Sequence, residues 1–202
     1  MVSSTGPFIY EKQGWGQGGL ATDKLRQEHE AALRVLKLLD RAVVHLKDNQ
    51  EINPFFFEEV IDFLQLFVVC AHHAKEEEIL FPFLKEKCIQ EKDVPVETIH
   101  QEHYKEHQLI EQMEKGFYLY KEGNPAGREI LIEVAELYTH IARRHIMKEN
   151  TLFMLADEVL SPEDQAKIRE DFDNLEQQKL YEGTAERLKE LVNELERQAF
   201  HW

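Results

Sequence analysis

Cysteine is scarce in this sequence, and long apolar runs are missing. Cys70 and Cys88 are the two cysteines among 202 residues, and they do not form the dense pattern of a disulfide-stabilised secreted domain. No apolar run approaches the roughly 20 residues that span a bilayer, and no basic segment followed by an apolar one opens the chain. We therefore expect a cytoplasmic protein with neither a signal peptide nor a membrane anchor.

Positive charge is also in short supply. The chain has 24 Lys and Arg against 39 Asp and Glu, a formal net charge of −15, and the acidic residues are spread along every segment. A surface that binds nucleic acid needs clustered positive charge, so we expect no nucleic-acid partner. The 43% of apolar and 31% of charged residues are typical of a globular helical protein.

The spacing of apolar residues predicts helices, because strand-like alternation and hairpin dipeptides are missing. Apolar residues three and four apart predict a helix from about residue 22 to 43 and a second from Pro54 to Leu84. A third helix is predicted from about residue 95 to Tyr120, and a fourth from Pro125 to Val159. Short connections favour antiparallel neighbours, so the expected fold class is all-α, an antiparallel up-down-up-down four-helix bundle.

Two further segments flank the predicted bundle. The glycine-rich residues 1–20 indicate an irregular N-terminal arm, and residues 161–202 carry the start signals of additional C-terminal helices. The expected organisation is therefore an arm over 1–20, a four-helix bundle over 21–160 and a C-terminal helical extension over 161–202.

Each of the four predicted core helices carries histidine, and on three of them a second possible metal ligand follows four residues later. Residues four apart lie on the same helix face, so each pair can hold one ion. A single histidine is more often an ordinary surface or core residue, but this repetition on three helices is hard to obtain from a solvated surface. The candidate ligands are His29, His72, Glu76, His103, His107, His145 and Glu149.

Such a set of donors suits two iron ions about 3.5–4 Å apart. Imidazole nitrogens bind iron well, and the carboxylates of Glu76 and Glu149 can bridge two ions and offset their charge. Zinc or manganese could occupy a site with these donors too. The second helix also leaves an alternative open, because His73 and Glu77 have the same spacing as His72 and Glu76, and both pairs have apolar neighbours.

Four motifs resemble the hemerythrin-like family, the HHE cation-binding domain, over roughly residues 20 to 160. They are LRQEHEAAL (25–33), HHAKEEEILFPFL (72–84), EHYKEH (102–107) and HIMKEN (145–150). In the family, a histidine is followed by glutamate four residues later and by proline ten residues later. The resemblance therefore implies His72 and Glu76 as ligands, and it places His73 and Glu77 outside the direct ligand set.

The resemblance also implies the metal and its use. It implies two iron ions, one bound by His103, His107 and His145 and the other by His29 and His72. A full complement of five histidines is typical of the oxygen-binding type. We expect a non-haem di-iron protein that binds O₂, or a related small ligand such as NO or peroxide, for storage, transport or sensing. The alternatives are a di-iron enzyme that reduces peroxide or NO or donates iron for cluster repair, and a metal-stapled helical interaction module.

Overall fold

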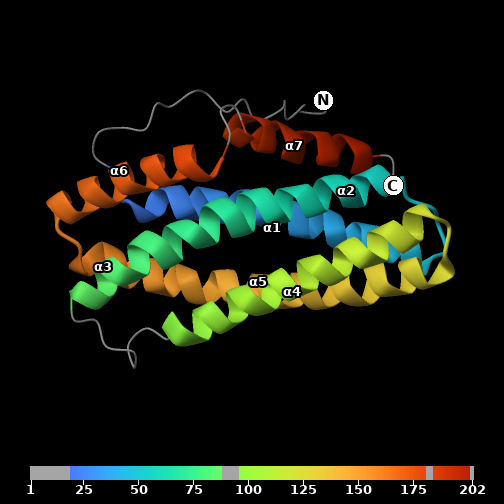
Figure 1. Ribbon diagram of the computed structural model, residues 1–202, viewed down its shortest axis with the longest axis horizontal. Helices are drawn as coiled ribbons and strands as arrows, with labels where there is room; N and C mark the ends of the chain where they lie inside the picture. Colours follow the sequence, from blue (N-terminus) through green and yellow to red (C-terminus); the bar gives the residue numbers. More distant parts are fainter. Residues whose placement is uncertain (1–18, 88–95, 181–183, 201–202) are drawn as a thin grey trace, which may run out of the picture.

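The computed structural model describes residues 19–87, 96–180 and 184–200, and over these residues the chain is helical and contains no strand. This confirms the predicted all-α class. Long helices lie side by side along one axis (Figure 1). In chain order they are α1 (Thr22–Lys47), α2 (Pro54–Phe63), η1 (Leu64–His73), η2 (Glu76–Leu80), α3 (Phe81–Glu86), α4 (Val96–Lys121), α5 (Pro125–Val159), α6 (Pro162–Lys179) and α7 (Thr184–Ala199). The predicted N-terminal arm lies, up to residue 18, outside the described residues.

Local chemistry sets several helix ends where the sequence predicts them. Asn53 and Asn124 each precede a proline, and each side chain accepts a hydrogen bond from the backbone two residues later. Ser161 and Asp164 form a reciprocal capping box at the start of α6. Gly123 follows α4 with a φ of 76°, a conformation that glycine adopts without steric cost. These ends are encoded locally, which is why they could be predicted.

The helix between residues 54 and 86 is continuous, as predicted, but its turns are not all α-helical. The segments η1 and η2 are π-helical, with wider turns that are rare and often mark functional sites. Ala71, His72, His73, Lys75 and Glu76 are all buried, so almost no side of this stretch faces solvent. The burial is possible because α1 and α4 pack against η1, and α6 packs against both η1 and η2.

Two apolar clusters form the core, and a polar layer separates them. Buried histidines occur on α1, on the helix from 54 to 86, on α4 and on α5. Along each of these four helices, a buried histidine lies between a residue of the larger cluster and a residue of the smaller one. The larger cluster includes Leu36, Val68, Leu109 and Ala142, and the smaller includes Leu25, Ile79, Ile99 and Leu152. The four elements therefore deliver their polar side chains to the same level of the fold.

The C-terminal helices pack on the rest of the molecule. The helix α7 lies against α1 and α2, where Leu188, Val192 and Leu195 are buried, and α6 lies against the π-helical segments (Figure 1). Within the described part of the chain, no helix has both the length and the apolar composition needed to cross a membrane.

Candidate metal centre

Four histidines from four helical elements point one ring nitrogen each toward a common point. The Nε2 atoms of His29 and His72 are 3.0 Å apart, and those of His103 and His145 are also 3.0 Å apart. The Glu149 carboxylate spans the two pairs: Oε2 lies 3.0 Å from Nε2 of His29, and Oε1 lies 2.7 Å from Nε2 of His145. A carboxylate in this position can bridge two cations.

Glu76 is the second carboxylate at this point, and it is fully buried. Its Oε1 lies 3.7 Å from Nε2 of His72, and its Oε2 lies 3.4 Å from Nε2 of His103. Neither oxygen accepts a hydrogen bond from any described residue. A buried carboxyl group without a partner is costly, so these two oxygens fit a cation bound between the histidine pairs.

The second ring nitrogen, Nδ1, of each of these four imidazoles contacts an oxygen atom on the side away from the common point. Metal-binding histidines usually donate their second N–H to a carboxylate or an amide oxygen, which sets the tautomer and the ring orientation. Here every Nδ1 faces an oxygen acceptor, so with a metal bound Nδ1 would carry the hydrogen and the Nε2 lone pair would be directed at the ion. The partners are Asn150 for His29 (3.3 Å), Glu28 for His72 (2.9 Å), Glu77 for His103 (2.6 Å) and Glu102 for His145 (3.2 Å).

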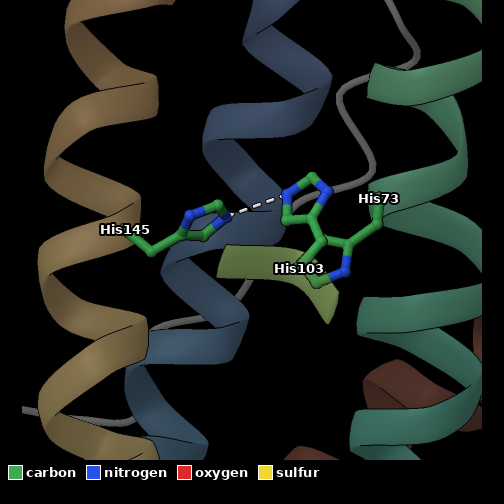
Figure 2. A group of neighbouring side chains, drawn as sticks. All are labelled: His73, His103 and His145. Carbon is green, nitrogen blue, oxygen red and sulfur yellow. Dashed lines mark hydrogen bonds between the residues drawn. The ribbon is translucent and has the colours of Figure 1, made fainter. Parts of the chain in front are cut away.

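His73 adds a fifth imidazole to the group. Its ring stacks on that of His103, with centroids 3.7 Å apart and planes 12° from parallel. Figure 2 shows this stacked pair, with His145 reaching His103 from the opposite side. At the buried centre the potential ligand atoms fall into two sets, each within 4.8 Å: His29, His72, Glu76 and Glu149 form one, and His73, His103 and His145 form the other.

His107, by contrast, is exposed, and the structure does not bring it into the group. The buried stripe of α4 runs through His103, Glu106, Ile110 and Met113. Because each residue turns the helix by about 100°, position 107 falls on the flank of this stripe. The sequence reasoning missed Glu106, although the apolar residues that follow it on the same face are a signal that could have found it.

The remaining sequence candidates are all buried at the centre: His29, His72, Glu76, His103, His145 and Glu149. Glu77, which the resemblance placed outside the direct ligand set, is half-buried and holds the outer nitrogen of His103. His73, placed outside by the same reasoning, is buried against His103 and offers a donor atom beside those of His103 and His145. The sequence left open whether His72 with Glu76 or His73 with Glu77 faces the centre. The π-helical turns bury both histidines, so the structure does not require a choice between them.

The two carboxyl groups at the centre have opposite pKa shifts in the metal-free protein. Burial and the nearby Glu149 carboxylate raise the pKa of Glu76 well above its ordinary value. Burial alone also raises the pKa of Glu149, but His145, His103 and His29 outweigh it and hold that pKa well below the ordinary value. Glu76 therefore keeps its proton to higher pH than Glu149 does, and a bound cation would take the place of that proton.

A small cavity adjoins the histidines. It holds about 20 Å³, enough for about one water-sized molecule. Glu106 and Tyr138 contribute to its wall, and burial raises the pKa of Glu106 to about 7. The rest of the wall away from the histidines is mostly apolar, with Leu36, Leu64, Phe67, Val68 and Ile146.

Five inward-facing imidazoles and two buried carboxylates define a metal-binding helical protein. Comparison with protein families places it further: the hemerythrin HHE cation-binding domain matches residues 20–156. The chain belongs to this family, as the sequence motifs predicted. Comparison with curated proteins and with solved structures found no match.

Proposed function

We propose that the protein is a non-haem di-iron protein that binds O₂, or a related small ligand such as NO or peroxide, for storage, transport or sensing. The observation that carries the proposal is the pair of carboxylates between two groups of histidines, with both Glu76 oxygens lacking a hydrogen-bond partner. Glu76 and Glu149 would contact both ions. His29 and His72 would hold one ion, and His73, His103 and His145 the other.

This ligand set differs from the sequence expectation at one position. His73 takes the place of His107, so five histidines and the division into three and two are both retained. In this proposal α1, the helix from 54 to 86, α4 and α5 are the four members of the antiparallel bundle. The oxygen acceptors at Nδ1 hold four of the five imidazoles, those of His29, His72, His103 and His145, in place before a metal arrives, which lowers the cost of ordering the site.

The cavity supports binding of a diatomic ligand. Iron, when bound, supplies redox-active positions for O₂, NO or peroxide. The cavity of about 20 Å³ adjoins the histidines, and its apolar side chains limit the access of water and protons. Leu36, Phe67 and Ile146 therefore favour reversible binding over turnover.

Glu106 is the observation that favours the enzymatic alternative, the reduction of peroxide or NO. Its carboxyl group lies in the cavity wall, its Oε1 has no hydrogen-bond partner, and burial raises its pKa to about 7. A carboxyl with such a pKa can hold or release a proton near neutral pH. If the protein is an enzyme, Glu106→Gln should retain the metal but lower turnover by roughly 100-fold, whereas reversible ligand binding should survive this change.

One spectroscopic experiment tests the proposal. The metal-free protein is loaded with Fe²⁺ without oxygen, its iron content is measured, and air is then admitted while the visible spectrum is recorded. We expect two iron ions per chain and a visible absorption that disappears when oxygen is removed. Irreversible bleaching or consumption of added peroxide favours the enzyme, and binding of zinc alone, or of no metal, contradicts the iron assignment.

Substitutions test the ligand set. His145→Ala and Glu149→Ala should remove most of the metal, because each eliminates a buried donor at the centre. His107→Ala and His140→Ala should leave the metal content unchanged, because both side chains are exposed. Metal analysis of the four purified variants checks this, and equal losses in all four would refute the assignment.

A further inference from the structure

The outer face of the metal centre carries a second group of metal donors. Glu77 Oε1 lies 2.6 Å from Nδ1 of His103 and 3.2 Å from Nδ1 of His100. All three side chains offer a donor atom within 4.8 Å of the others. The side chains of Glu77 and His100 are 37% and 38% exposed, whereas that of His103 is only 4% exposed. The group therefore connects solvent to a buried residue of the centre.

An aromatic ring holds this group in place. His100 meets the buried Phe81 edge to face, with centroids 5.4 Å apart, and the Phe81 ring lies 15° from parallel to that of His103. One side chain thus positions both imidazoles. Glu77 and Phe81 come from the helical stretch before residue 87, and both histidines come from α4.

We propose that Glu77, His100 and Nδ1 of His103 form a loading site that captures divalent transition-metal cations such as Fe²⁺ from solvent and passes them to the buried centre. The inference rests on the metal centre proposed above and adds the route by which ions reach it. One carboxylate and two imidazoles form a donor set that suits Fe²⁺, and water can complete the coordination on the exposed side.

The two nitrogens of His103 explain how capture and final binding can alternate. Nδ1 faces the outer group, while Nε2 faces Glu149 at 3.1 Å and His145 at 3.0 Å. In the metal-free protein the ring hydrogen of His103 can lie on Nε2, where Glu149 accepts it, and Nδ1 is then available to an ion held by Glu77 and His100. Once Nε2 binds an ion in the centre, Nδ1 donates its hydrogen to Glu77 and orients the ring, so the outer group no longer retains the cation.

The test compares the kinetics and the equilibrium of metal loading. Metal-free protein is mixed with Co²⁺, whose visible absorption reports on bound ligands, and the association rate, the dissociation rate into a chelator and the dissociation constant are measured. His100→Gln should slow association about 10-fold, because the local capture of the cation is lost. Since His100 is not part of the final site, dissociation should slow by the same factor and the dissociation constant should not change.

Two further variants test whether slower loading of His100→Gln results from the loss of cation capture. Glu77→Gln should slow loading and also weaken binding, because it removes both the capture group and the anchor of His103. His140→Gln replaces an exposed histidine on α5 and should load like the parent protein. If His100→Gln loads at the parental rate, or binds less metal at equilibrium, the loading site is overturned but the metal centre is not. A parent protein that binds no divalent metal overturns the metal centre and the loading site together.

Discussion

Replacing Lys75 with methionine should destabilise the protein by about 3–5 kcal/mol, the usual effect of removing one partner from a buried ion pair. The Lys75 side chain is fully buried. Its Nζ contacts Glu28 Oε1 and lies 2.8 Å from Oε1 of Glu176 on α6. Without the ammonium group, two carboxylates that are 8% and 22% exposed would face each other across an apolar side chain.

The pKa of Glu28 gives a second measure of this interaction. Burial acts to raise that pKa, but Lys75 and His72 outweigh it and lower it from 4.5 to about 2. Each pKa unit corresponds to about 1.4 kcal/mol, so the contacts of ionised Glu28 with Lys75 and His72 together contribute about 3 kcal/mol, net of its burial. Because the folded-state pKa is below the unfolded one, this contribution is present above pH 4.5 and is lost as the pH falls toward 2.

Thermal unfolding of the metal-free protein measures the effect. A chain of this length loses about 2–4 °C in Tm per kcal/mol, so Lys75→Met should lower Tm by about 6–20 °C. Lys179→Met is the matched control, because Lys179 pairs with Glu78 between the same parts of the fold but on the surface, and it should cost less than about 1 kcal/mol. Equal Tm values for the two variants would refute the reasoning.

Three further predictions concern the contact between α4 and α5 and the metal centre. Gly127→Ala should lower the free energy of unfolding, measured with urea, by about 1–3 kcal/mol, because the alanine Cβ would lie 2.2 Å from the Tyr120 backbone nitrogen. This effect is opposite to the usual preference of helices for alanine over glycine. Unchanged stability would contradict this close approach. Glu28→Gln should weaken metal binding about 10- to 100-fold in a chelator competition, since Glu28 holds Nδ1 of His72. An unaltered affinity would show that this anchor is dispensable. Removing the metal with a chelator should lower Tm, because Glu76 then loses its cation and is left buried without a hydrogen-bond partner. A Tm that does not respond to metal would contradict a site at Glu76.

The sequence determined the features that depend on neighbouring residues along the chain. Asn53 and Asn124 before their prolines fixed the starts of α2 and α5, and the apolar spacing fixed the all-α class. The motifs on four helices led to the correct family. Two of the three i, i+4 pairs, His72 with Glu76 and His145 with Glu149, consist of side chains that the fold brings together at one level, whereas His107 of the third pair is exposed. These signals are local, so they could be predicted without knowledge of how the helices pack.

Only the tertiary structure decided which side of each helix faces the centre. The π-helical turns of η1 bury His72 and His73 together, and neither register of a regular α-helix predicts that. The packing of α4 turns Glu106 inward and His107 outward. The burial of Lys75 depends on Glu176, which is 101 residues away in the sequence. Helix rotation and long-range ion pairs are set by the packing of side chains from distant segments, and periodicity within one helix contains no information about that packing.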